Sequence, residues 1–304
     1  MEATFLTDQQ IWGDDRGNGQ LQAMKSYGTK TGMSDLAIVL GGYMGSDTTS
    51  DNQRSGYVWS ASSDGGGSVR DVHVVGVRDD GGPRERLLGA RPALPSSVTS
   101  SIKPSEARLT QKISGVDVVE YGEYPQTIAA DNVSRELEQV FSRNQLKATG
   151  KKYTFDGEKY DAYSKPFKAK EYAEYEHRGK RYIRVEAQPY DSDSVLSNGK
   201  TPQKGEACWI EVQPIKWLKD TSGVWVARQA LFAGVQFDRK QSYDGNFENT
   251  DIKKYLQNHF AKEMVAGRSV NTNAPAVVGA STAAVAARRD TQRQRALEDP
   301  SQGL

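Results

Sequence analysis

The sequence lacks the cysteines that a disulfide would need. Cys208 is the only cysteine among 304 residues, so no intrachain disulfide can form. Folding must then depend on burial and hydrogen bonding, which fits a reducing compartment better than a disulfide-stapled secreted protein. The first fifteen residues, MEATFLTDQQIWGDD, contain neither the basic nor the apolar segment of a secretory signal, and the sequence has no run of about 18 apolar residues. We therefore expect no membrane span and a cytoplasmic or virion-associated protein.

An excess of charge of either sign is also missing. Lys and Arg number 40 and Asp and Glu number 39, which gives a formal net charge of +1. No basic field of the kind that attracts phosphate backbones results, so we expect no nucleic acid partner. Hydrophobic residues make up only 36% of the chain and charged residues 26%, which indicates globular domains with a sizeable polar remainder.

Motifs that carry catalysis or bind metals are absent. The sequence contains no GxxxxGK[ST], no GxGxxG after a strand, no HExxH and no GxSxG. The three histidines, His73, His177 and His259, are far apart and none has a second ligand at metal spacing. Cys208 lies at the start of an expected strand between Ala207 and Trp209, which favours a buried structural thiol over a nucleophile. We therefore expect no enzyme activity, no cofactor and no metal.

Residues 1–97 are rich in glycine and aspartate and contain both helical and strand patterns. Ser34 precedes the apolar segment DLAIVL and is expected to cap a short helix that ends at Gly41-Gly42. Short strands are expected at 56–62, 69–77 and 89–95, separated by glycine-rich turns. In the middle strand, alternation directs Val72 and Val74 to the core and Asp71 and His73 to water.

A Ser/Thr-rich stretch at 98–114 has few apolar residues and is expected to be a linker to a second α+β domain at 115–266. In that domain we expect an amphipathic helix at 131–144 and a hairpin turn at 177–179. Thr250 is expected to cap a closing helix whose apolar residues share one face: Ile252, Tyr255, Leu256, Phe260 and Met264. Residues 267–304 have no aromatic residue and no apolar period, which predicts a flexible tail.

The stretch 56–95 contains several elements in a specific order: Trp59-Ser60, Arg70, Val72, Gly76 and the segment GARPAL at 89–94. In this order it resembles the C-terminal half of C-type-lectin-like domains. That superfamily includes formylglycine-generating enzymes and the variable proteins of diversity-generating retroelements. The resemblance implies an aromatic strand, an arginine-bearing strand and a closing GARPAL strand in a small sheet that supports long exposed loops. Arg91 can tie a loop through several hydrogen bonds.

We expect the ligand-binding residues to lie on those loops or on outward strand positions. A surface that mixes Tyr, Ser, Asp, His and Arg can both stack and hydrogen-bond, as antibody paratopes do. The alternative is an ordinary solvated loop region. The candidate ligand-binding residues are Tyr57, Ser62, Ser63, Asp64, Asp71, His73, Arg78, Asp79 and Asp80.

The second unit resembles a family of uncharacterised domains of gut-type bacteria and their phages. The matching segments are EYGEYPQT (120–127), QPIKWLKD (213–220), WVARQALFAG (225–234) and TDIKKYLQNHF (250–260). In that family the corresponding segments precede the lectin-like half, whereas here the GARPAL block comes first. Residues 1–97 could complete a partner domain, the chain could be permuted, or the two units could be degenerate modules.

Two activities within the superfamily conflict with this sequence. Formylglycine-generating enzymes rely on a pair of cysteines, and this chain has one. Calcium-dependent lectins present oxygens through E/Q-P-N/D and W-N-D triplets, neither of which occurs here.

The expected fold class is α+β, with a C-type-lectin-like module, a second antiparallel-sheet-and-helix unit and a flexible C-terminal tail. The expected function is non-catalytic display or binding of a protein or glycan ligand, as in a retroelement-diversified variable protein or a phage receptor-binding component. The alternative is a structural or assembly subunit of a virion or cell-surface complex, which would be a homo-oligomer or part of a larger assembly. A third interpretation is an accessory recognition domain of a larger machine.

Overall fold

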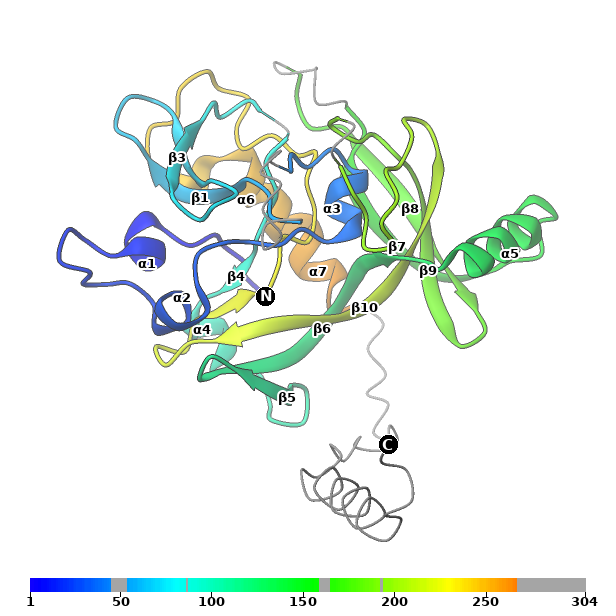
Figure 1. Ribbon diagram of the computed structural model, residues 1–304, viewed down its shortest axis with the longest axis horizontal. Helices are drawn as coiled ribbons and strands as arrows, with labels where there is room; N and C mark the ends of the chain where they lie inside the picture. The colour runs from blue at the N-terminus through cyan, green and yellow to red at the C-terminus, as the bar shows by residue number, and fades with distance from the viewer. Residues whose placement is uncertain (45–53, 86, 159–164, 192–193, 267–304) are drawn as a thin grey trace, which may run out of the picture. The chain divides into compact units, whose positions relative to one another are not determined.

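The fold consists of two antiparallel sheets and a set of short helices (Figure 1). The computed structural model describes residues 1–44, 54–85, 87–158, 165–191 and 194–266. The mixture of helices with antiparallel strands confirms the predicted α+β class. The tail predicted at 267–304 lies outside the described residues.

The smaller sheet contains three strands in the order β1 (Val58–Ser63), β2 (Val69–Val72) and β3 (Arg78–Gly81). The strand predicted over 69–77 is shorter than expected because residues 73–77 form a tight turn. In this turn, His73 N–H donates to Val77 O (2.9 Å) and Gly76 N–H donates to His73 O (2.7 Å). Gly76 has a φ of 87°, and a Cβ there would lie 2.5 Å from Thr29 Oγ1, so only glycine fits.

The larger sheet is built around two long strands, β6 and β10, which pair along most of their length. On its other side β10 pairs with β9 at one end and with β11 at the other. The eight strands are β4 (Ala93–Leu94), β5 (Arg108–Ile113), β6 (Val116–Ile128), β7 (Lys147–Asp156), β8 (Ala169–His177), β9 (Lys180–Glu186), β10 (Ala207–Lys219) and β11 (Trp225–Ala227). The turn predicted at 177–179 joins β8 to β9, with positive φ at Arg178 and Gly179.

The helices are short, and two of them begin at the predicted caps. Ser34 Oγ accepts a hydrogen bond from Ala37 N–H, and Thr250 Oγ1 accepts one from Lys253 N–H. No helix in the described part of the chain is long and apolar enough to cross a membrane. The helical elements are α1 (Asp8–Trp12), α2 (Gln22–Tyr27), α3 (Asp35–Val39), α4 (Ser96–Thr99), α5 (Asp131–Ser142), η1 (Phe247–Asn249), α6 (Asp251–Tyr255), η2 (Leu256–Phe260) and α7 (Ala261–Glu263).

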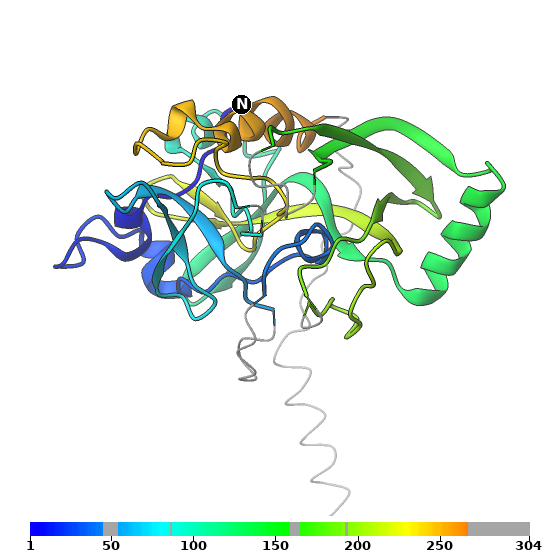
Figure 2. The ribbon, with the colours of Figure 1, turned by 90° about the horizontal axis from the view of Figure 1, so that it is seen from above.

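The elements α6, η2 and α7 follow one another without a break and close the core. Their predicted apolar face is confirmed, since Ile252, Tyr255, Leu256, Phe260 and Met264 are all buried. In Figure 2 this orange helical segment lies above the long strands β6 and β10. Its aromatic rings contact Tyr124 of β6 and Phe232, with centroids 5.1 Å apart for Phe260–Tyr124 and 5.0 Å for Tyr255–Phe232.

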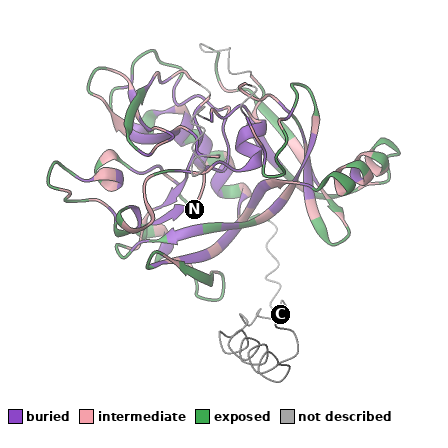
Figure 3. Ribbon diagram, viewed as in Figure 1, coloured by how far each residue is buried: buried purple, intermediate pink, exposed green. Residues whose placement is uncertain are grey.

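A single compact unit, Met1–Arg268, replaces the two predicted domains 1–97 and 115–266. The first predicted domain contributes β4 to the larger sheet, where Ala93 pairs with Val226 of β11. One buried apolar cluster extends from Ala3 to Met264. Figure 3 shows this burial along β6 and β10. Ala93 and Val226 are more than a hundred positions apart, so no pattern among neighbouring residues predicts that they pair.

The linker predicted at 98–114 is wrong as well. It contains the end of α4 and the whole of β5, which pairs with β6. Five of the six residues of β5 are exposed, so backbone hydrogen bonds rather than burial hold this edge strand. A low apolar content therefore does not distinguish such a strand from a linker.

Candidate functional site

The predicted ligand-binding residues are divided between the two faces of the small sheet. In the ladder, Trp59 pairs with Asp71 and Asp71 with Asp79, while Val72 pairs with Arg78. Neighbouring residues of a strand point to opposite faces, so the register separates two groups. Asp71, His73, Asp79 and Tyr57 share one face, and Arg70, Arg78 and Asp80 share the other.

The second face carries a cluster of ion pairs around Asp8 of α1. Arg78 Nε lies 3.3 Å from Asp8 Oδ2, and its guanidinium lies 5.2 Å from the centre of the Trp12 ring. Arg70 Nη1 lies 2.6 Å from Asp80 Oδ1. Arg78 and Asp80 are exposed as predicted, but their charges are already paired within the chain. We therefore assign them to holding α1 against the small sheet.

The predicted residues Ser62, Ser63 and Asp64 are half-buried and also serve the framework. Ser62 Oγ accepts a hydrogen bond from Asp8 N–H (3.0 Å), and Ser63 Oγ donates to Tyr243 O (3.4 Å). Asp64 Oδ1 accepts from Gly66 N–H and Ser68 N–H, both at 2.8 Å, and so shapes the loop between β1 and β2. The hydrogen bond from Gly66 is the main cause that lowers the pKa of Asp64.

Asp71 was predicted to face water and is instead buried, with 2% of its surface exposed. Its Oδ1 has no hydrogen-bond partner, and a Cβ added at Gly81 would lie 3.0 Å from its Oδ2. Burial, followed by the charges of Asp79 and Glu85, raises the pKa of Asp71 to about 8. The alternation of side chains along β2 places Asp71 on the predicted face of the small sheet. Other parts of the chain cover that face at Asp71, so the side chain does not reach water.

Four aromatic side chains form a continuous row where β1 begins and β2 ends. The ring centroids of His73 and Tyr57 are 4.6 Å apart in an edge-on contact. Tyr57 stacks on Tyr43 at 4.9 Å with planes inclined by 8°, and Tyr43 contacts Tyr190 at 4.6 Å. All four side chains are half-buried. We call them the aromatic row: His73, Tyr57, Tyr43 and Tyr190.

Polar groups and an apolar side chain border the aromatic row. The hydroxyls of Tyr43 and Tyr57 make no hydrogen bond with any described residue, so both are open to a ligand. Burial, Tyr43 and the exposed Asp79 raise the pKa of Tyr57, which keeps its hydroxyl protonated. Val77, in the turn after His73, is 55% exposed. Stacking surface, hydrogen-bond donors and a carboxylate thus occur together.

Two members of the aromatic row, Tyr57 and His73, are among the predicted ligand-binding residues, whereas Tyr43 and Tyr190 are not. Tyr43 follows Gly41-Gly42, and Tyr190 follows Pro189 in a polar segment more than a hundred residues further on. Tyrosines in polar, glycine- or proline-containing segments are typical of binding loops, and this signal could have singled them out. Their approach to Tyr57 depends on long-range folding.

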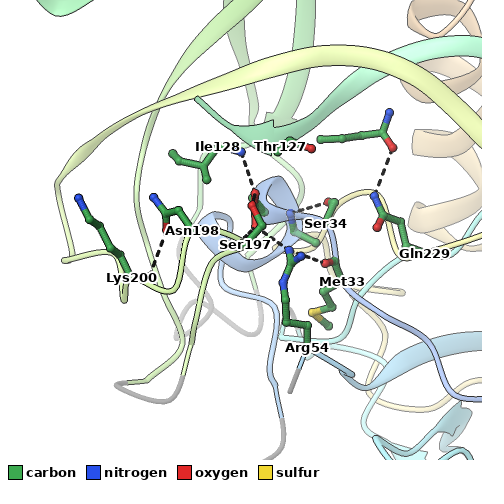
Figure 4. A network of polar contacts seen from close by, with 12 residues as sticks. Met33, Ser34, Arg54, Thr127, Ile128, Ser197, Asn198, Lys200 and Gln229 are labelled. Carbon is green, nitrogen blue, oxygen red and sulfur yellow. Dashed lines mark hydrogen bonds and ion pairs between the residues drawn. The ribbon is translucent and has the colours of Figure 1, made fainter. Parts of the chain in front are cut away.

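A second polar network, centred on Asp35 at the start of α3, joins distant parts of the chain (Figure 4). The buried Asp35 carboxylate accepts hydrogen bonds from the Ile128 and Ser197 backbone N–H groups and pairs with Arg54. Ser197 Oγ also donates to it. Because every oxygen is used by the chain itself, this network holds the fold and leaves no acceptor for a ligand.

Cys208, His177 and His259 lie in separate surroundings within the described part of the chain. Burial, followed by Glu206 and Asp35, raises the pKa of Cys208 to about 12, so the thiol stays protonated at neutral pH. His177 Nε2 lies 3.4 Å from Glu136 and His259 Nδ1 lies 3.7 Å from Glu263, each in a separate, partly buried pair. Among the described residues, no three His, Cys, Asp or Glu side chains form a group that could hold a metal ion.

Comparison with known proteins assigns no family to the chain. No family model matches it, and neither the curated proteins nor the solved structures contain a significant match.

Proposed function

We propose that this protein is a non-catalytic binding protein that recognises a protein or glycan ligand through the aromatic row. The observation that carries the proposal is the stacked pair Tyr43–Tyr57, extended by His73 and Tyr190 and left partly open to solvent. Exposed aromatic surface lowers the stability of a domain relative to one in which the same rings are buried. Binding of a ligand over the row would bury these rings and recover that stability.

Tyrosine rings favour both proposed ligand classes. They give a large contact area with little loss of conformational entropy, because each side chain has only two rotatable angles. The row is also pre-organised, since each ring is held by its neighbour, and this lowers the entropy lost on binding. Asp79 at the border adds a carboxylate that can accept hydrogen bonds from sugar hydroxyls or pair with a basic residue of a protein.

We also propose that the small sheet and the GARPAL segment belong to a C-type-lectin-like module. The placement of the aromatic strand supports this: β1 pairs with the arginine-bearing β2, and Val58 bridges to Gly89 at the start of GARPAL. Arg91 ties the centre of the unit, donating from Nε to Ala227 O (2.8 Å) and from Nη1 to Thr31 Oγ1 (2.9 Å).

The test is to screen the full chain against immobilised glycans and against a displayed peptide library, and then to repeat the measurement with Tyr57→Ala. We expect at least about a tenfold loss of affinity for the selected ligand, because aromatic residues at the centre of an interface carry a large share of the binding energy. Tyr172→Ala is the matched control, since Tyr172 is also half-buried and contacts the ring of Phe155 at 5.5 Å.

Two outcomes count against the proposal. In one, the selected ligand binds Tyr57→Ala as tightly as it binds the unaltered chain. In the other, neither library yields a ligand under conditions in which the chain is folded.

Retroelement diversification is a separate part of the proposal and has its own test. Sibling copies of the gene should vary at Tyr43, Tyr57, His73 and Asp79 while keeping the buried Trp59, and a template repeat with a reverse transcriptase should lie nearby. Variation concentrated at buried positions would contradict diversification without affecting the binding proposal.

A second candidate function, an assembly subunit, is favoured by the exposed edge strand β5. Leu109 near its start is 62% exposed, and an open edge can pair with a strand of another chain. Light scattering after size-exclusion chromatography separates the two candidates. A monomer favours ligand display, whereas a stable symmetric assembly that Leu109→Lys dissociates favours the assembly role.

A further inference from the structure

A polar pocket of about 360 Å³ lies beside the larger sheet, between β10 and the segment that follows β11. Its charged lining residues, Lys216 and Arg228, are both cations, and none of its lining residues is acidic. Tyr27, Gln213 and Gln229 contribute further polar side chains to the lining of the pocket.

The two cations lie opposite each other, with Lys216 in β10 and Arg228 directly after β11. Arg228 N–H donates to Lys216 O at 2.8 Å, one position beyond the Trp217–Ala227 pair of the β10–β11 ladder. Like charges opposite each other in a ladder repel, so this arrangement costs stability unless an anion lies between them. On its other side Lys216 stands opposite Glu120 in the β6–β10 ladder, but the Glu120 carboxylate is bound by Arg108. Neither Lys216 nor Arg228 forms an ion pair with any described carboxylate.

Several hydrogen-bond donors in the pocket remain available. Arg228 Nε donates to the Tyr27 hydroxyl oxygen (3.2 Å), while its Nη groups have no acceptor among the described residues. Thr127 Oγ1 donates to Gln213 Oε1 at 2.9 Å, which leaves the Gln213 amide N–H groups for another acceptor. The Tyr27 proton is likewise not used by any described residue.

A chain of amides fixes this arrangement. Gln126 Nε2 donates to Gln213 O at 2.8 Å, so its Oε1 is the atom that accepts from Gln229 Nε2 at 3.2 Å. The donors of the pocket are therefore held by the sheet before a ligand arrives, which lowers the entropy lost on binding.

A third cation lies beneath the pocket. Arg91 is buried and bonds to Ala227 O and Thr31 Oγ1, the chain neighbours of the lining residues Arg228 and Gly32. Its Nη2 has no hydrogen-bond partner, and no described carboxylate pairs with it. A buried charge is weakly screened, so Arg91 adds positive potential to the pocket above it.

We propose that this pocket binds a small ligand that carries a phosphate or sulfate group, with Lys216 and Arg228 on either side of the oxyanion. A tetrahedral oxyanion presents acceptors in several directions, which matches donors that come from two strands and from Tyr27 of α2. The volume lies at the small end of the range for ligand sites and fits a molecule of monosaccharide size. This site is distinct in residues and chemistry from the aromatic row.

Isothermal titration calorimetry of the full chain at low ionic strength tests the proposal with four probes: glucose 6-phosphate, glucose 6-sulfate, inorganic phosphate and glucose. We expect the anionic probes to bind and glucose not to bind. Lys216→Gln and Arg228→Gln should each weaken binding by about tenfold, because each removes a charge-assisted contact. Lys219→Gln is the matched control: Lys219 is an exposed lysine of the same strand that does not line this pocket.

A comparison of the probes identifies which part of the ligand is recognised. Equal affinity for inorganic phosphate and glucose 6-phosphate supports recognition of the oxyanion alone, whereas tighter binding of the sugar phosphate supports recognition of both parts. The proposal is overturned if no anionic probe binds, or if Lys216→Gln and Arg228→Gln bind the probes as the unaltered chain does.

Stability without ligand gives a second readout. Lys216 is exposed and lies between Arg228 and Glu120 in the sheet. Lys216→Gln therefore removes one repulsion and one attraction and should change the melting temperature at low salt only slightly. Arg228→Gln loses the hydrogen bond to Tyr27 and could fold less well for that reason. Lys216→Gln therefore tests the anion site independently of Arg228→Gln. A marked fall in the melting temperature of Lys216→Gln would show that Lys216 has a partner in the fold and would overturn the proposal.

Discussion

Asp71 stands opposite Asp79 in the β2–β3 ladder, and only Asp79 is exposed. The two carboxylates share one face of the small sheet, where Asp71 lies beside the buried Trp59 near Gly81. Burial and the charge of Asp79 raise the pKa of Asp71 to about 8, so this carboxyl is largely protonated at neutral pH. The face that carries the aromatic row is therefore less negative than its sequence suggests.

The raised pKa of Asp71 predicts that stability falls with increasing pH. Between the unfolded value of 3.8 and the folded value of about 8, the folded chain holds a proton that the unfolded chain has released. The free energy of unfolding should then decrease by roughly 2–4 kcal/mol from pH 5 to pH 8, since each pH unit in this window accounts for up to about 1.4 kcal/mol.

Urea unfolding at several pH values measures this dependence. Asp71→Asn should remove most of it, because the amide resembles the protonated acid, whereas the exposed Asp80→Asn should retain it. The same slope in Asp71→Asn as in the unaltered chain would show that Asp71 is ionised in the folded protein.

Trp59→Ala should lower the free energy of unfolding by about 3–5 kcal/mol. Trp59 is 2% exposed and its ring contacts Phe237 at 5.3 Å, so truncation leaves a cavity between the small sheet and the rest of the core. Trp12→Ala is the comparison, because Trp12 is half-buried and should cost less. Chemical denaturation of the two variants gives the values, and an equal cost would place Trp59 outside the core.

Asp35→Asn should destabilise the whole unit by about 2–4 kcal/mol. The substitution removes the charge that pairs with Arg54 and turns an amide N–H towards the donors of Ile128 and Ser197. Since Met1–Arg268 is one compact unit, calorimetry should show one transition that shifts as a whole. Two separate transitions would contradict a shared core, and the exposed Asp131→Asn serves as control.

Cys208 should react slowly with thiol reagents in the native state. Burial holds its pKa at about 12, and the thiolate is the reactive form. Modification by a disulfide reagent should become fast only after addition of denaturant. Fast modification of the folded chain would place Cys208 at an accessible site.

Sequence patterns predicted the features that depend on interactions between residues close together in the chain. Ser34 and Thr250 cap their helices because a side-chain oxygen near free backbone N–H groups is sufficient, and the apolar face of the closing helix follows from its period. The long-range features were missed. The pairing of Ala93 with Val226 joins the two predicted domains into one unit, and the composition of the sequence does not indicate this pairing. Backbone hydrogen bonds hold β5, so its composition does not indicate a strand either.

The candidate site was predicted only in part for the same reason. Tyr57 directly precedes β1 and His73 directly follows β2, and a sequence pattern can pair these two strands. Tyr43 and Tyr190 join them through the tertiary fold. Alternation placed Asp71 and His73 on one face of the sheet correctly. Whether that face meets water or other parts of the chain depends on residues such as Phe237, far along the sequence.

Hydroxyl-radical footprinting, read by mass spectrometry with and without the ligand selected from the libraries, tests the central claim most directly. We expect the ligand to protect Tyr43, Tyr57 and His73 from oxidation while Tyr172 on the larger sheet reacts as before. Protection confined to other residues, with the aromatic row equally reactive in both states, would contradict recognition through these rings.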